Sequence, residues 1–276
     1  MNAAVPTTLT ILALLVVPGA TAFAQVDMDG HKLTTQVRVG TDEYRDSRGR
    51  RSYVQSVNVT RRVSDDFTIE AVANGGRYFG SGFTGGGGTL WWKPSTTSYL
   101  QFGGLRNSST MTTHVWAATI EAGGLLYKSK KRDRALKAME GSFTQTWKGY
   151  DAALQTSVAV STPRVVLYLP AGFDLTLQAN VVDLVEAGAH HVAPGGGARV
   201  HVSPAQRVEL MALAGFDSEG NTSIAPTLGL SGRSYGGGAK VWLNRTTSVE
   251  VFVVQSTYSI SRSTGTTYGA LFLRRF

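Results

Sequence analysis

The sequence predicts an all-β chain that closes into a single antiparallel, up-and-down transmembrane β-barrel of about 12–14 strands. Three observations support this fold class: an export signal at the N-terminus, apolar and polar residues that alternate with a period of two, and a repeated glycine-rich hairpin. No apolar run of about 18 residues or more occurs after residue 24, which excludes membrane-spanning helices.

The N-terminal segment has the organisation of a cleaved signal peptide. An apolar stretch, a helix breaker and a small-x-small cleavage motif follow in order at Leu9–Val17, Pro18-Gly19 and Ala22-Phe23-Ala24. The pattern departs from the usual one in that no Lys or Arg precedes the apolar stretch. We expect cleavage between Ala24 and Gln25, and the chain then divides into a signal peptide at 1–24, a periplasmic linker at 25–32 and a barrel at 33–276.

Strands are expected wherever apolar residues alternate with polar ones between turn-forming clusters. Val37 and Val39, for example, alternate with Gln36 and Arg38. The expected strands lie near 33–42, 51–61, 66–76, 84–93, 98–106, 112–122, 137–147, 153–168, 172–182, 194–203, 207–217, 227–243, 247–258 and 266–276. Pro163 is expected to interrupt one strand and Pro170-Ala171-Gly172 to form a turn, and a different organisation of 122–168 leaves a barrel of 12 strands open.

A glycine-rich hairpin recurs along the chain, at 195–210, at 236–251 and more loosely at 86–100. A turn centred on Arg245 would place Val241 opposite Val249 and Lys240 opposite Glu250. The same register in the earlier copy would place Val200 opposite Val208 and Arg199 opposite Glu209. We therefore expect the valines to face lipid and the lumenal ion pairs to comprise Arg199, Glu209, Lys240 and Glu250.

An even number of strands places both chain ends on the periplasmic side, together with the three repeat turns. The longer connections are then expected outside the cell, at 42–51, 75–85, 183–194 and 217–226. Aromatic residues near strand ends are typical of the two interfacial girdles of a membrane barrel. The candidates are Trp91, Trp92, Tyr99, Trp242, Tyr258 and Tyr268, although ordinary core packing is the alternative for each.

The C-terminal strand resembles the assembly signal of bacterial outer-membrane barrels. Tyr268, Phe272 and the terminal Phe276 share one face, as in that signal, while Arg274 departs from it because the position is usually apolar. The resemblance implies insertion into a Gram-negative outer membrane by the barrel-assembly machinery, with outer-membrane lipid and lipopolysaccharide as neighbours.

Within this class the chain is similar to YaiO-type barrels. The residues that carry this similarity are Arg50-Arg51-Ser52-Tyr53, Arg61-Arg62, Gly76-Arg77-Tyr78-Phe79 and Trp91-Trp92 within the glycine-rich hairpin. The resemblance implies a role in the export of envelope polysaccharide.

The formal net charge of +8 suggests anionic partners. One dense basic cluster comprises Lys128, Lys130, Lys131, Arg132, Arg134 and Lys137. This cluster is either a solvated turn or a contact for lipopolysaccharide or phospholipid phosphates. Nucleic acid is not expected as a partner, because the chain carries an export signal and lacks a clustered basic and aromatic surface.

Catalytic motifs are not evident in the sequence. His114, His190, His191 and His201 lack a neighbouring nucleophile motif, and Gly229-Leu230-Ser231-Gly232 is not a nucleophile elbow. The absence of cysteine excludes thiolate metal sites and cysteine nucleophiles, and we expect neither a cofactor nor a metal.

These observations favour a non-enzymatic outer-membrane barrel that serves as a narrow channel or as an accessory of envelope export. Two alternatives are a barrel enzyme that acts on membrane lipid, through a His–Ser pair assembled from separate strands, and a soluble secreted β-sandwich that binds a ligand.

Overall fold

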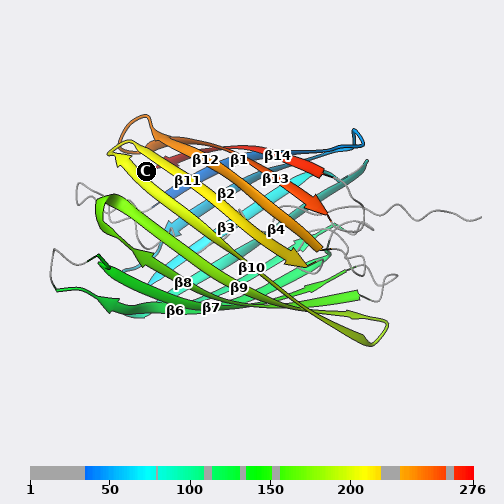
Figure 1. Ribbon diagram of the computed structural model, residues 1–276, viewed down its shortest axis with the longest axis horizontal. Coiled ribbons are helices and arrows are strands. Elements are labelled where there is room, and N and C mark those ends of the chain that lie inside the picture. Colours follow the sequence, from blue (N-terminus) through cyan, green and yellow to red (C-terminus); the bar gives the residue numbers. More distant parts are fainter. Residues whose placement is uncertain are drawn as a thin grey trace, which may run out of the picture.

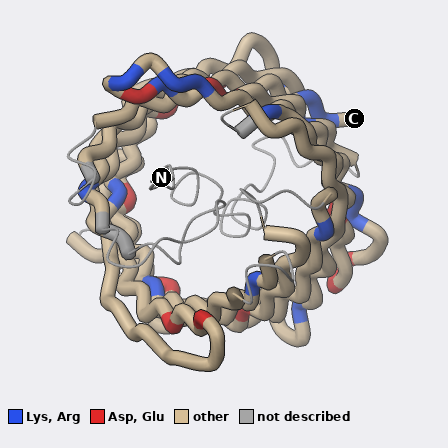
Figure 2. The backbone as a smooth tube through the Cα atoms, turned by 90° about the vertical axis from the view of Figure 1, so that its right-hand side faces the viewer, with Lys and Arg blue, Asp and Glu red and all other residues tan. Residues whose placement is uncertain are grey.

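The computed structural model describes residues 35–78, 80–108, 114–130, 135–150, 156–218, 231–258 and 264–276. The signal peptide at 1–24 and the linker at 25–32 lie outside these residues. The described residues form fourteen strands that close into one antiparallel barrel, as Figures 1 and 2 show. The strands are β1 (Thr35–Asp46), β2 (Arg51–Arg62), β3 (Phe67–Tyr78), β4 (Ser81–Ser95), β5 (Ser98–Asn107), β6 (Trp116–Lys128), β7 (Ala138–Gly149), β8 (Thr156–Tyr168), β9 (Phe173–Glu186), β10 (Ala189–Ala205), β11 (Val208–Ser218), β12 (Ser231–Trp242), β13 (Thr247–Tyr258) and β14 (Thr264–Arg275).

Every strand pairs with its neighbour in sequence, and β1 closes the barrel against β14. The closing register runs from Gln36 opposite Arg275 to Asp46 opposite Gly265. A closed ring leaves no unpaired strand edge, so the predicted barrel is confirmed with fourteen strands, and the alternatives of twelve strands or a β-sandwich are wrong. None of the described helices is long and apolar enough to cross a membrane.

The two ends of the barrel differ. We call the end where β1 begins and β14 finishes the proximal end, and the other the distal end. The turns that follow β4, β10 and β12, which are those of the hairpin repeat, all lie at the proximal end, as predicted.

Three of the four connections expected to be long are instead tight turns at the distal end. Only residues 47–50, 79–80 and 187–188 separate the paired strands there, while much of the fourth, 217–226, lies outside the described residues. The strands simply continue further than a bilayer requires, since a spanning strand needs about 9–11 residues and β10 has 17. The β9–β10 hairpin projects from the distal end at the lower right of Figure 1.

The middle of the chain is more regular than expected. Pro163 does not interrupt β8 but faces outward opposite Phe143. The β8–β9 pairing has a gap between Ser161 and Arg164, which fits the missing N–H of proline. The predicted turn Pro170-Ala171-Gly172 is confirmed as a short 3-10 turn, η2 (Pro170–Gly172), between β8 and β9.

The register of the hairpin repeat is predicted correctly in one copy and wrongly in the other. In β12–β13, Val241 lies opposite Val249 and Lys240 opposite Glu250, as expected. In β10–β11, Arg199 lies opposite Leu213 and Val200 opposite Ala212, so the predicted pairs with Glu209 and Val208 are wrong. The turn lies at residues 206–207, about two residues later than predicted, because β10 continues to Ala205; an irregularity between Val202 and Ala205 adds a shift of only one residue.

The two surfaces of the wall have opposite character. Large apolar side chains such as Val57, Phe102, Leu177 and Val253 are exposed on the outer surface. The inner surface carries most of the buried polar residues, and its apolar clusters centre on Val182 with Leu184 and on Phe252 with Val254. In a water-soluble protein the outer band would be an unfavourable exposed apolar surface, whereas it suits contact with lipid.

Candidate functional site: the inner wall of the barrel

The inner wall carries a row of ionisable side chains in which acidic and basic residues alternate. We call this row the charged belt and define it as Asp174 on β9, His201 on β10, Glu209 on β11, Lys240 on β12, Glu250 on β13, Arg38 on β1 and Glu70 on β3. Each belongs to the inward-facing set of its strand, because its neighbours along the chain, such as Val200, Val241 and Val251, are exposed outside. Acidic and basic residues lie beside one another around the ring in Figure 2.

The middle of the belt is joined by direct contacts. His201 Nδ1 lies 2.6 Å from Asp174 Oδ2, and His201 Nε2 lies 3.5 Å from Glu209 Oε2. Lys240 Nζ lies 3.3 Å from the same Glu209 oxygen, and Trp242 Nε1 donates to Glu209 Oε1 at 2.7 Å. The Glu209 carboxylate on β11 is therefore contacted from both neighbouring strands, β10 and β12.

All four predicted lumenal charges face inward, but their partners differ from the prediction. Lys240 lies between Glu209 on β11 and Glu250 on β13, with its direct contact to Glu209. Arg199 instead donates to Thr176 Oγ1 on β9 at 3.4 Å, since the shifted register of β10–β11 removes Glu209 from its side.

A second polar group lies across β5 to β8, and we call it the Arg164 network. Arg164 NH2 on β8 lies 2.6 Å from Glu121 Oε1 on β6, and Arg164 Nε donates to Ser142 Oγ at 3.0 Å. Thr144 Oγ1 donates to Glu121 Oε2 at 2.9 Å, and the Tyr99 hydroxyl donates to Glu121 Oε1. The Arg164 and Glu121 side chains are only 6 % and 3 % exposed, so this ion pair is almost fully enclosed.

Three aromatic residues predicted for the interfacial girdles point into the barrel instead. Trp91 is 1 % exposed and donates from Nε1 to Gln101 at 3.0 Å. Tyr99 belongs to the Arg164 network, and Trp242 bonds Glu209 while Lys240 and Arg275 lie over its ring. The prediction used their position near a strand end, but strand parity turns these side chains inward, where each N–H or O–H donates to a polar partner.

The other predicted aromatic residues fit the outer surface. Trp92, Tyr268, Phe272 and Phe276 are exposed there, and Trp92 stacks on Phe67. The face shared by Tyr268, Phe272 and Phe276 is therefore the outer one, and the Arg274 guanidinium packs over the Phe276 ring on that face. The side chain of Tyr258 lies outside the described set.

The histidines are not grouped into a metal site. His190 Nδ1 lies 3.0 Å from Asp183 Oδ2 on the outer face of the β9–β10 hairpin, whereas His201 belongs to the charged belt inside. His114 is buried and its ring lies edge-on to Tyr150. Within the described ranges, no three His, Asp or Glu side chains are placed to hold a metal ion.

The basic cluster lies in the connection between β6 and β7, at the proximal end. Lys128, Lys130 and Lys137 are described, whereas residues 131–134 lie outside the described set. This connection lies at the same end of the barrel as the start of β1 and the end of β14.

Comparison with known proteins identifies the fold. No protein-family model and no curated protein sequence matches the chain. Among solved structures, the outer membrane protein Omp33 of Acinetobacter baumannii superposes with a TM-score of 0.53 at 12 % identity, covering 89 % of this chain and 100 % of that one. A mutant of the monoaromatic hydrocarbon channel TodX gives a TM-score of 0.51 at 8 % identity, with 89 % and 91 % covered.

A FadL homologue of Pseudomonas aeruginosa gives a TM-score of 0.50 at 9 % identity, covering 88 % of this chain and 90 % of that one. The chain therefore has the fold of the outer-membrane β-barrels. Identities this low establish the fold alone, because one barrel architecture carries many different functions.

Proposed function

We propose that this chain is a non-enzymatic channel of a Gram-negative outer membrane. The observation that carries the proposal is the closed wall itself, apolar outside and lined inside by the charged belt and polar side chains. In such a closed wall the backbone N–H and C=O groups of neighbouring strands pair with one another, as lipid requires. The polar inner surface offers water or a polar solute a hydrated path.

The proposed orientation places the proximal end in the periplasm, as expected for an even number of strands with the start of β1 and the end of β14 on one side. The basic cluster at the β6–β7 connection then faces the periplasm. Because lipopolysaccharide occupies the outer leaflet, that cluster would be a solvated turn or a contact for inner-leaflet phosphates. We also propose that Tyr268, Phe272 and Phe276 present the outward face recognised by the barrel-assembly machinery.

The charged belt suggests what the channel would pass. Its acidic and basic groups alternate, so the field along the wall changes sign over short distances. A lining of this kind favours small hydrated solutes of either charge and gives only weak ion selectivity.

The absence of catalysis is part of the proposal. Among the described residues, neither His190 nor His201 makes a hydrogen bond to a Ser or Thr hydroxyl, so neither is placed to activate such a nucleophile. Lipid hydrolysis by the folded barrel would overturn this part of the proposal.

A second candidate is the export role implied by the YaiO-type resemblance, in which the barrel accompanies polysaccharide secretion without conducting on its own. The mutual pairing of the lumenal charges favours it, since side chains that satisfy one another leave fewer groups for a permeating solute.

The deciding experiment combines gel electrophoresis of the detergent-extracted protein, with and without boiling, and conductance in a planar bilayer. A heat-dependent mobility shift with steady conductance is the expected result. The same shift without conductance would favour the accessory role. A protein that stays soluble without detergent and shows no shift would contradict the membrane assignment altogether.

A further inference from the structure

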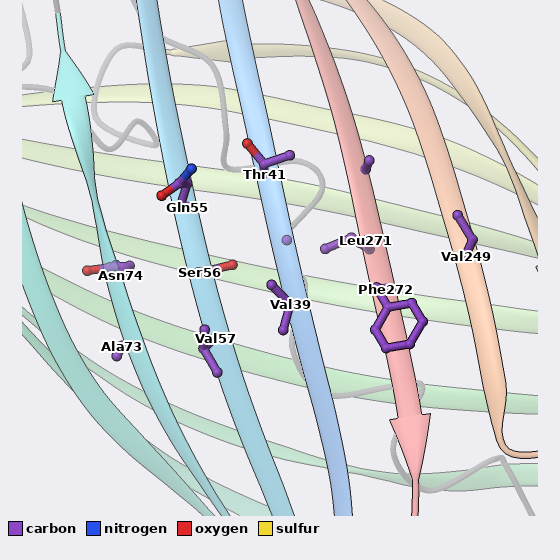
Figure 3. Close-up of a pocket in the computed structure, with 12 residues that line it drawn as sticks. Val39, Thr41, Gln55, Ser56, Val57, Ala73, Asn74, Val249, Leu271 and Phe272 are labelled. Carbon is purple, nitrogen blue, oxygen red and sulfur yellow. The ribbon is translucent and has the colours of Figure 1, made fainter.

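The outer surface has an apolar groove where the barrel closes. The groove has a volume of about 660 Å³, and its lining includes Val39, Thr41, Gln55, Val57, Ala270 and Phe272 from β1, β2 and β14. Figure 3 shows these side chains along neighbouring strands. Val39, Val57 and Phe272 are 45 %, 43 % and 43 % exposed, which places the groove on the lipid-facing side.

Residue size explains the groove. Ala73 and Ala270 contribute only a methyl group each to the outer surface, whereas Phe272, Val57 and Val39 on the same or neighbouring strands carry larger side chains. In a membrane such a depression is filled by hydrocarbon, because an empty apolar cavity forfeits dispersion contacts.

Three arginines lie on the same outer surface, toward the distal rim. Each is four residues from a groove position on its own strand: Arg45 from Thr41 on β1, Arg51 from Gln55 on β2, and Arg77 from Ala73 on β3. Strand geometry puts them about 13 Å from the groove along the strands, roughly the separation of a lipid headgroup from the middle of its acyl chains. We call Arg45, Arg51 and Arg77 the rim arginines.

The rim arginines carry more positive charge than the protein neutralises. Arg45 and Arg51 are direct cross-strand partners, an arrangement that is destabilising for like charges. Glu43 contacts Arg45 at 2.7 Å, and both side chains are about half exposed. In the part of the chain that the structure describes, the side chains of Arg51 and Arg77 make no hydrogen bond or ion pair, so Glu43 is the one carboxylate in contact with any of the three guanidinium groups.

We propose that the rim arginines and the groove together form a binding site for lipopolysaccharide. The arginines would bind its phosphates, for which the guanidinium group has a fitting geometry, and the groove would hold one of its acyl chains. The phosphates would also relieve the repulsion between Arg45 and Arg51. This inference rests on the proposed orientation, which puts the distal end at the outer leaflet.

The experiment compares the folded full-length barrel with two sets of variants in detergent, using labelled lipopolysaccharide as the probe. The first set is Arg45→Ala/Arg51→Ala/Arg77→Ala, which removes the rim charge, and Ala270→Phe, which fills the groove. The matched control is Arg61→Ala/Arg207→Ala/Arg274→Ala, which removes the same number of exposed arginines at the proximal end. The heat-dependent mobility shift verifies that every variant is folded, so a loss of binding is separable from a loss of the barrel.

We expect the triple variant to bind lipopolysaccharide at least about tenfold more weakly and Ala270→Phe to weaken binding with no change of charge, while the control binds as the parent does. Enzymatically dephosphorylated lipopolysaccharide should bind the parent as weakly as intact lipopolysaccharide binds the triple variant. Equal binding by the triple variant and the control would overturn the proposal, as would equal affinity of the parent for phosphatidylglycerol micelles.

A third outcome would also overturn it: a parent that is dimeric, and that Ala270→Phe makes monomeric while lipopolysaccharide still binds. The groove would then be the contact with a second copy of the chain. None of these readouts depends on conductance, so they can fail independently of the channel.

Discussion

The Arg164 network and the charged belt are built from the same residue types on the same inner wall, yet their exposure differs. In the network, Arg164 and Glu121 are 6 % and 3 % exposed, and each makes further hydrogen bonds to neighbouring strands. In the belt, His201 and Glu209 are 25 % and 24 % exposed. An ion pair that water cannot reach fixes the wall, whereas one that water reaches can respond to what passes along it.

Removal of Glu121 should produce the largest effect of any single change in either region. Glu121→Ala leaves the Arg164 guanidinium enclosed without its carboxylate, and breaking a buried pair in this way costs about 3–5 kcal/mol. Equilibrium unfolding in guanidinium chloride, followed by tryptophan fluorescence in micelles, measures the change.

The double variant Glu121→Ala/Arg164→Ala is the control for that measurement. It should recover part of the lost stability, because no unpaired charge remains enclosed. If the free energy of unfolding of Glu121→Ala lay within about 0.5 kcal/mol of the parent value, water would reach the Arg164 network. The two regions would then not differ in the way proposed.

Replacing one buried tryptophan and one tryptophan of the charged belt by phenylalanine tests the same difference between enclosed and water-exposed polar groups. Trp91→Phe leaves the side-chain oxygen of Gln101 without its donor where both residues are buried, which should cost about 1–3 kcal/mol. Trp242→Phe removes a comparable bond to Glu209 in the belt, but Glu209 keeps Lys240 and His201, so the cost should stay below about 1 kcal/mol. The same unfolding experiment measures both variants. Equal losses of unfolding free energy in Trp91→Phe and Trp242→Phe would contradict the difference between the enclosed site and the belt.

The sequence predicts the architecture better than it predicts these two regions. The alternation of apolar and polar residues and the turn-forming residues are local signals. They were sufficient to predict the closed barrel and the register of β12–β13, where a short turn follows Trp242. The register of β10–β11 could not be predicted in the same way, because β10 continues through Ser203-Pro204-Ala205 and turns at residues 206–207, a choice that no clear pattern in the sequence marks.

The Arg164 network was missed for a different reason. Arg164 and Glu121 are 43 residues apart and come together across an intervening strand, which no local pattern encodes. Trp91 and Trp242 were assigned to the wrong surface although the signal was present. Each shares its parity with a polar inward neighbour, Thr89 and Lys240 respectively, and parity decides the surface more reliably than position near a strand end.

The smallest expected effect concerns ion selectivity, and it tests the function of the belt directly. Glu209→Gln removes one negative charge from the belt while preserving side-chain size and an acceptor oxygen. The remaining Lys240 and His201 should then favour anions, with a change of about twofold in the chloride-to-potassium permeability ratio. The reversal potential across a planar bilayer in a potassium chloride gradient measures that ratio.

Glu121→Gln is the matched control, because it removes the same charge from the enclosed network. Its permeability ratio should equal that of the parent, since a side chain that is 3 % exposed lies outside the path of hydrated ions. Exposure can be verified independently because the chain contains no cysteine: Glu209→Cys should react with a water-soluble maleimide much faster than Glu121→Cys. If both glutamine variants shift the ratio equally while only Glu209→Cys reacts, the belt would line the path without controlling it, and selectivity would arise from the overall charge of the inner wall.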